Sequence, residues 1–215
     1  MNVSDILDNV IDLSIGRDEA DDEERATFLN YLNMASEELY RLTAPFDEQR
    51  SQTHIQQNFD ESVNIELKDS EGDEIDILAV SKVRSKQFEK FSQVSFALLQ
   101  EKKFMGEAYT PIFCVRKNVF TLYSNGTKPY DVFMAYTPIF IDFTGDEEEG
   151  DIPFRIEWHP LLVYGTLYYI YQDMDGFKSS VKESIAASEW KSGIEKYARS
   201  LFNSSPDGYI PYTRV

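Results

Sequence analysis

The chain holds few of the side chains that most often act as nucleophiles or metal ligands: one cysteine and two histidines among 215 residues. Cys114 lies in an apolar run typical of a strand, which favours a small core residue and leaves no partner for an internal disulfide. His54 lies in a polar strand. His159 precedes Pro160 at an expected helix start, where the helix dipole disfavours a protonated imidazole. We therefore expect a neutral, structural His159 and no catalytic triad.

Carboxylates are abundant, and two groups of them could bind a cation. Asp173-x-Asp175-Gly176 is similar to part of a calcium loop, but the complete loop would need an acid or Asn at Tyr171 and a Glu at Lys182. The run 147–149, three glutamates, could attract a divalent cation weakly, although a solvated loop is the simpler interpretation. We expect a turn at the first place, a solvated loop at the second, and neither a metal site nor a cofactor.

One pair of acids, Asp142 and Glu157, could serve a glycosidase-like hydrolase that acts on the cell wall. Such an enzyme needs two carboxyl groups about 5–10 Å apart in a cleft, one of them with a raised pKa. Structural roles are the simpler expectation for both residues. The chain also lacks a glycine-rich phosphate loop, so the residues predict no enzyme.

The charge of the chain limits its partners. The formal net charge is −17, and residues 1–50 hold 13 acids and 4 bases. Such a balance argues against a firm grip on nucleic-acid phosphates and fits a solvated face or a surface past which DNA slides without sticking. No run approaches the about 18 apolar residues of a membrane span, and no secretory signal is visible. We expect a soluble protein made in a cytosol.

The elements are organised around the stretch 151–175. Pro160 fits the first turn of a helix, and apolar or aromatic side chains then recur at steps of three and four around most of the circumference. A helix that is apolar nearly all round is normally buried against several neighbours, so this segment predicts a central helix.

Three more helices are expected in the two ends of the chain. One has Ser4 as its N-cap and ends near Gly16, and the next has a strong apolar repeat from Phe28 to Leu42 and stops at Pro45. A C-terminal amphipathic helix includes the apolar positions Phe177, Val181, Ile185, Ala186, Trp190, Ile194, Tyr197, Ala198 and Leu201, unbroken or bent near Gly193.

The middle of the chain reads mainly as strands. Alternation in 63–67 and 75–79 around the turn 70–73 predicts one hairpin, and 85–103 predicts a helix. Asn125-Gly126 predicts a second hairpin between 114–124 and 130–136, followed by an extended piece, 137–143, with Pro138 at an edge or a strand start.

These elements predict an α+β fold: an antiparallel helical bundle of N-terminal and C-terminal helices, an inserted antiparallel β module and an extended C-terminal tail. The expected divisions are 1–50 for the N-terminal helices, 51–152 for the β module, 153–205 for the C-terminal helices and 206–215 for the tail.

The order of the parts resembles the head-to-tail connector (adaptor) proteins of tailed bacteriophages. The resemblance rests on residues 26–42, on the strand–turn–strand block 118–138, on the acidic loop before Ile152-Pro153, and on Trp158-His159 leading into 161–170. It is a likeness of order and spacing over most of the chain. The stretch 85–103 departs from the pattern, since it is longer and more helical.

The resemblance implies a structural virion protein rather than an enzyme. It implies a homo-oligomeric ring, commonly a dodecamer, below the portal protein of the filled capsid, which extends the channel for double-stranded DNA and offers a platform to the tail or the next neck protein. DNA would pass without specific binding, no membrane is involved, and assembly occurs in the host cytoplasm. The tail would bind the portal through Tyr209, Ile210, Pro211 and Tyr212. Another neck or tail ring component, such as a stopper or tail-tube connector, is the nearest alternative, and the cell-wall hydrolase is a further one.

Overall fold

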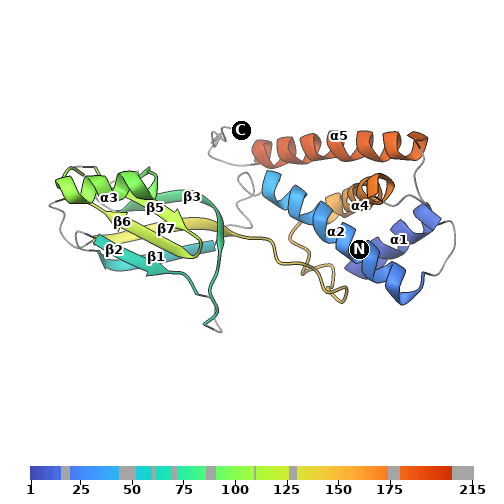
Figure 1. Ribbon diagram of the computed structural model, residues 1–215, viewed down its shortest axis with the longest axis horizontal. Helices are drawn as coiled ribbons and strands as arrows, with labels where there is room; N and C mark the ends of the chain where they lie inside the picture. Colours follow the sequence, from blue (N-terminus) through green and yellow to red (C-terminus); the bar gives the residue numbers. More distant parts are fainter. Residues whose placement is uncertain are drawn as a thin grey trace. The chain divides into compact units, whose positions relative to one another are not determined.

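The computed structural model of the protein describes residues 1–15, 20–43, 52–59, 62–68, 72–85, 91–108, 110–125, 130–173 and 180–204. Its helices are α1 (Val3–Ile15), α2 (Asp22–Thr43), α3 (Phe96–Met105), the short 3-10 helix η3 (Ile156–Trp158), α4 (His159–Asp173) and α5 (Ser180–Ser204). Its strands are β1 (Gln52–Phe59), β2 (Ser62–Glu66), β3 (Ile77–Ser85), β4 (Ser92–Gln93), β5 (Ile112–Arg116), β6 (Val119–Tyr123) and β7 (Tyr130–Pro138). The fold is α+β, with two sheets inserted between N-terminal and C-terminal helices that pack together (Figure 1).

The chain divides into two compact units. The helical unit combines Met1–Asp47 with Phe140–Val215, and the β unit is the continuous segment Glu48–Ile139. The sequence predicts the second division after residue 152. In the structure the segment from Phe140 onward already belongs to the helical unit. The reason lies in contacts that this segment makes with α2.

Asn33 of α2 binds that segment through its amide side chain. Its Nδ2 donates to the carbonyl oxygen of Phe143 at 3.1 Å, and its Oδ1 accepts from the Phe143 N–H at 2.8 Å. The side chain thus replaces a neighbouring strand for one residue of an irregular backbone. Ring contacts add to this attachment, since Phe140 lies 5.7 Å from Tyr40 and 5.2 Å from Phe143 between centroids.

Helix α4 is the centre of the helical unit, as the sequence predicts. It packs against α1, α2, α5 and η3, and Figure 1 draws it among the other helices of this unit. Because partners surround it, apolar side chains are buried on several of its sides. The buried residues are His159, Leu161, Leu162, Val163, Gly165, Thr166, Leu167, Ile170 and Tyr171.

Two glycines allow α4 and α5 to approach closely. A Cβ on Gly165 of α4 would lie 2.7 Å from the ring of Trp190, and one on Gly193 of α5 would lie 2.2 Å from the side chain of Leu161. Both distances are shorter than a carbon–carbon contact allows. Gly193 therefore marks a close contact, and α5 runs unbroken through it.

The first two helices begin with reciprocal side-chain caps. The Asp5 N–H donates to Oδ1 of Asn2 at 2.7 Å, while the Asn2 N–H donates to Oδ2 of Asp5 at 3.0 Å. Asp21 and Glu24 make the same pair of bonds at the start of α2. The predicted N-cap of α1, Ser4, is therefore wrong, because Asn2 offers a side-chain acceptor two residues earlier.

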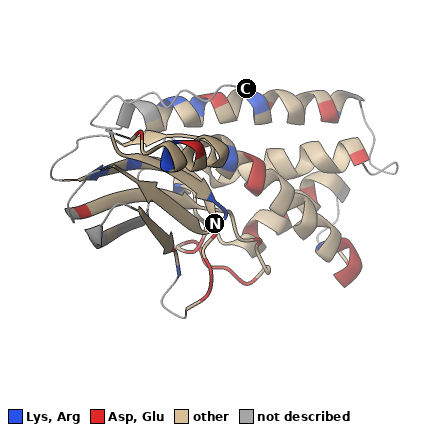
Figure 2. Ribbon diagram, turned by 60° about the vertical axis from the view of Figure 1, so that its left-hand side comes forward, with Lys and Arg blue, Asp and Glu red and all other residues tan. Residues whose placement is uncertain are grey.

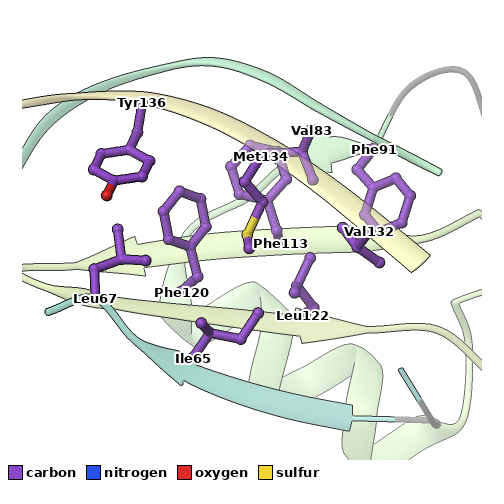
Figure 3. Close-up of a cluster of buried hydrophobic side chains, with 10 residues drawn as sticks. All are labelled: Ile65, Leu67, Val83, Phe91, Phe113, Phe120, Leu122, Val132, Met134 and Tyr136. Carbon is purple, nitrogen blue, oxygen red and sulfur yellow. The ribbon is translucent and has the colours of Figure 1, made fainter. Parts of the chain in front are cut away.

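The β unit has two sheets that pack face to face. Their strand orders are β1-β7-β3 and β2-β6-β5-β4, and Figure 3 shows side chains from both sheets pointing toward one another. The side chains of this core are Ile65, Leu67, Val83, Phe91, Phe113, Phe120, Leu122, Val132, Met134 and Tyr136. The alternation predicted for 63–67 is confirmed, since Ile65 and Leu67 are buried whereas Asn64 and Glu66 are exposed.

Neither predicted hairpin forms, because consecutive strands enter different sheets. β2 pairs with β6, and β3 pairs with β7. Among the described residues, only the turn end of the first hairpin remains, as the Lys68–Glu74 bridge and the 3.1 Å bond from the Ile75 N–H to the Leu67 carbonyl oxygen. β6 pairs with β5 through a tight turn in which Lys117 has φ 53°, whereas β7 pairs with β1 and β3. Burial on two facing sheets overrides the local turn signals. Pro138 ends β7, and the residues just after it form no strand.

The predicted helix in 85–103 is shorter and later than expected. Phe91 belongs to the core between the sheets, Ser92–Gln93 forms β4, and only Phe96–Met105 is helical, with Ser95 as its N-cap. β4 pairs parallel to β5, so this sheet is mixed rather than purely antiparallel. A parallel pair needs a crossover, and α3 provides it while covering the outer face of the sheet.

Candidate functional site

The predicted site residues fall on different parts of the molecule. The portal-binding candidates Tyr209, Ile210, Pro211 and Tyr212 lie outside the described residues, as do Asp175 and Gly176 of the expected turn. Cys114 is buried against α3 as predicted, and burial raises the pKa of its thiol despite opposing effects of Thr121 and Arg116. A raised pKa keeps the thiol protonated and unreactive.

The carboxylates of the hydrolase alternative, Asp142 and Glu157, are both exposed to solvent. A general acid of this class obtains a raised pKa from burial, which neither residue has. Among the described residues, no group of three or more His, Cys, Asp or Glu side chains is placed to hold a metal ion. No described helix is both long and apolar enough to cross a membrane.

The best-organised polar cluster joins the N-terminus, the acidic loop and the start of α4. The ammonium group of Met1 pairs with the carboxylate of Glu149, and the Val3 N–H donates to the carbonyl oxygen of Glu147 at 3.2 Å. His159 is fully buried beside them, with Nδ1 3.0 Å from the Met1 carbonyl oxygen and Nε2 3.0 Å from that of Phe154. A carbonyl oxygen only accepts, so a neutral ring donates to one of the two at a time.

Glu147 stabilises the acidic loop from within. Its carboxylate accepts hydrogen bonds from the N–H and the hydroxyl of Thr144, at 2.6 and 2.9 Å, and from the Gly145 N–H at 3.0 Å. Partial burial by itself would raise the pKa of Glu147, but the hydrogen bonds outweigh it and lower that pKa. The ammonium of Met1 lowers the pKa of Glu149 by its hydrogen bond and its charge. This cluster holds the N-terminus, the acidic loop and the start of α4 together.

A second polar cluster ties three helices together. Oε2 of Glu38 on α2 accepts from the hydroxyl of Tyr169 on α4 at 2.8 Å and from Nε1 of Trp190 on α5 at 3.0 Å. Burial, and then the bond to Glu38, raise the pKa of the Tyr169 hydroxyl. The Tyr169 hydroxyl therefore keeps its proton at neutral pH, and the indole N–H of Trp190 does not titrate. The cluster fixes the packing of α2, α4 and α5.

Helix α3 carries a group of residues that sequence reasoning did not single out. Of its ten residues only Leu99 is buried, whereas Phe104 is 92% and Met105 is 55% exposed. The preceding residues are Lys102 and Lys103. The signal that could have found them is the Lys-Lys-Phe-Met sequence just before the helix-ending Gly106, where one helical turn places two cations beside two large apolar side chains.

No model of a known protein family matches this chain, and a search of curated protein sequences finds no relative.

Proposed function

We propose that the protein is a structural component of the virion neck of a tailed bacteriophage. It forms a ring below the portal, connects the capsid to the tail and extends the channel through which DNA passes. The proposal starts from the resemblance in the order of helices, strands, acidic loop and Ile-Pro segment. That resemblance is one of sequence order, and the physical properties of the helical unit support the proposal.

The observation that carries the proposal is the concentration of charge. The helical unit holds 25 acidic and 10 basic residues, a net charge of −15, whereas the β unit holds 13 and 11, a net of −2. Figure 2 shows acidic residues along the N-terminal helices and the loop at 146–151. A wall of this sign repels phosphates, so DNA would slide past it without specific binding.

A ring requires surfaces that bind neighbouring copies. A heterologous contact joins two different surfaces of the same chain. Copies joined in this way form a closed ring when the rotations from one copy to the next add up to one full turn. Large apolar side chains are exposed on both units, including Ile141 at 81%, Val181 at 66% and Phe104 at 92%. Val181 and Ile185 were expected on the apolar face of the last helix, and their exposure makes them available to a partner.

The extended C-terminal tail is the part that would bind the portal. The segment 206–215 contains Tyr209, Ile210, Pro211 and Tyr212, which are aromatic and apolar anchors of the kind that interfaces favour. Another neck or tail ring component remains the alternative, with the same contacts between copies and a different neighbour.

The experiment mixes the chain with portal rings of its own virus and follows co-sedimentation, with negative-stain micrographs of the pellet. We expect rings stacked on portals for the natural chain. We expect that deletion of 206–215, or Tyr209→Ala with Tyr212→Ala, leaves a folded protein whose portal affinity falls about tenfold or more. The matched control is Met34→Ala, an exposed apolar side chain of α2 outside the tail. A chain that never forms rings and ignores the portal would contradict the proposed function, and a truncated chain that binds normally would contradict the role of the tail.

A further inference from the structure

Helix α3 leaves most of its large apolar side chains exposed to solvent. It packs on β5 through Leu99, and its other large apolar residues, Phe96 (39%), Leu98 (38%), Phe104 (92%) and Met105 (55%), are exposed. A surface helix normally turns charged or polar residues toward water. Within the part of the chain that the structure describes, α3 thus buries one large apolar side chain and leaves four exposed.

Three basic side chains lie beside these apolar side chains, an excess of one over the acidic Glu101 and Glu107 of the same stretch. Lys102 pairs with Glu107 at 3.0 Å, Lys103 donates to the neutral hydroxyl of Ser62 at 3.1 Å, and the Arg116 guanidinium lies 4.5 Å from the ring centroid of Phe96. Lys103 and Arg116 make no ion pair with any other described residue. We call Lys102, Lys103, Phe104, Met105 and Arg116 the α3 surface.

The opposite combination lies on α1 of the helical unit. Asp5, Asp8 and Asp12 are exposed at spacings of three and four, which places them along one face of the helix. Leu13, 49% exposed, follows them directly. Within this row, Asp8 binds Arg25 at 2.8 Å in an exposed ion pair, Oδ2 of Asp5 accepts the Asn2 N–H at 3.0 Å, and Asp12 is exposed. The row thus offers acids beside an apolar side chain, where the α3 surface offers bases beside apolar side chains.

We propose that the α3 surface of one copy docks on the α1 acidic row of a second copy. Charge complementarity selects this occupant, because the chain itself supplies an acidic face in a unit of net charge −15. The two surfaces are different, as a heterologous contact requires. The inference rests on the proposed function and deepens it, since it names the contact that joins neighbours in the ring.

Two full-length double variants test the contact. Lys102→Glu with Lys103→Glu makes the α3 surface acidic, and Asp8→Lys with Asp12→Lys makes the α1 row basic. Each variant alone sets like charges opposite one another, so we expect the concentration at which copies associate to rise about tenfold or more. Sedimentation velocity over a concentration series measures it. Thermal melting by circular dichroism checks that both variants fold, and Phe104→Ser gives the same weakening without any change of charge.

Mixing the two double variants in equal amounts gives the decisive measurement. In the mixture, an acidic α3 surface meets a basic α1 row, and the natural α3 surface of the other variant meets a natural α1 row. Both contacts are complementary, so we expect association to return to within about threefold of the natural chain. The matched control is Met34→Ser, an exposed apolar residue of α2 outside both surfaces, which should change nothing. Raising the salt from about 50 mM to about 500 mM should weaken the natural association, because exposed charges are screened.

The outcomes separate the two proposals. If the natural chain associates and neither double variant alters this, or if the mixture fails to restore association, the docking contact is overturned while the ring stands. If the natural chain remains a monomer at every concentration and also beside portal rings, the proposed function and the docking contact both fall. Binding of single-stranded DNA or of phosphatidylserine vesicles that Lys102→Glu with Lys103→Glu abolishes, with association unaltered, would assign the α3 surface to another occupant and overturn the proposal.

Discussion

The two units are stabilised in different ways. The β unit is one continuous segment, and its core lies between two sheets in which Phe120 contacts Phe113 and Tyr136, with ring centroids 6.2 and 6.1 Å apart. The helical unit unites both ends of the chain, and polar side chains join residues more than a hundred positions apart. Asn33 binds Phe143 and Glu38 binds Trp190 in this way.

The difference teaches where each unit is vulnerable. The β unit should tolerate a change of charge at its surface. Its net charge is only −2, and its stability comes from buried apolar side chains. The helical unit carries a net charge of −15, so its specific hydrogen bonds and ion pairs must offset self-repulsion. Its α4–α5 contact also depends on glycines, which leave no space for a larger side chain.

Removing the largest fully buried side chain of each unit should destabilise the two units separately. Trp190 is 1% exposed and Phe120 is 0% exposed. We expect Trp190→Ala to destabilise the helical unit, and Phe120→Ala the β unit, each by about 3–5 kcal/mol through lost burial and a cavity. Chemical denaturation followed by amide hydrogen exchange, read separately for the two units, measures this.

Matched controls keep that comparison sharp. Trp190→Phe keeps one aromatic ring but loses the Nε1 donor to Glu38 and part of the buried ring volume, so it should cost about 1–3 kcal/mol. Phe120→Leu should cost less than Phe120→Ala. If either alanine substitution reduced the protection of amides from hydrogen exchange equally in both units, the two cores would not be independent.

The glycine contact gives the next largest effect. Gly165→Ala places a methyl group 2.7 Å from the Trp190 ring, so the helices must move apart, and we expect a loss of about 1–3 kcal/mol in the helical unit alone. An alanine normally stabilises a helix interior by about 1 kcal/mol relative to glycine, so even the sign of the change is informative. Gly150→Ala is the control, because open space surrounds that position. A Gly165→Ala protein that melts at or above the natural temperature would refute the close contact.

The smallest effect concerns pH. The folded-state pKa of Glu147 is lowered from 4.5, so its hydrogen bonds stabilise the helical unit above that pH and are lost as the pH falls below it. We expect thermal stability to decrease from about pH 4.5 downward, and Glu147→Gln to reduce this dependence while costing about 1 kcal/mol or less at neutral pH. The control is Glu148→Gln, an exposed neighbour in the same loop. If Glu147→Gln lost thermal stability at low pH to the same extent as the natural chain, other carboxylates would cause that loss.

Much of this architecture follows from the sequence because the decisive patterns are local. The helix from Pro160 is apolar nearly all round and is central, the repeat from Phe28 to Leu39 is buried, and Ile65 and Leu67 alternate with exposed polar residues. Leu42 continues the repeat in the sequence but is 44% exposed in the last turn of α2.

Strand pairing could not be predicted, because a strand bonds whichever neighbour the packing of the two sheets brings to it. Asn125-Gly126 is a strong hairpin signal, but β6 and β7 on either side of it belong to opposite sheets. The parallel β4–β5 pair likewise depends on α3 crossing over the sheet.

The amino-acid sequence by itself determined that two helical ends enclose a β-rich middle and that the acids gather near the N-terminus, since period and charge are properties of the chain. Only the tertiary structure decided that Asn33 draws Phe143 into the helical unit, that Gly165 receives the Trp190 ring, and that Phe104 stands in solvent. Each of these depends on which distant segment arrives at a given side chain, and no local pattern encodes that.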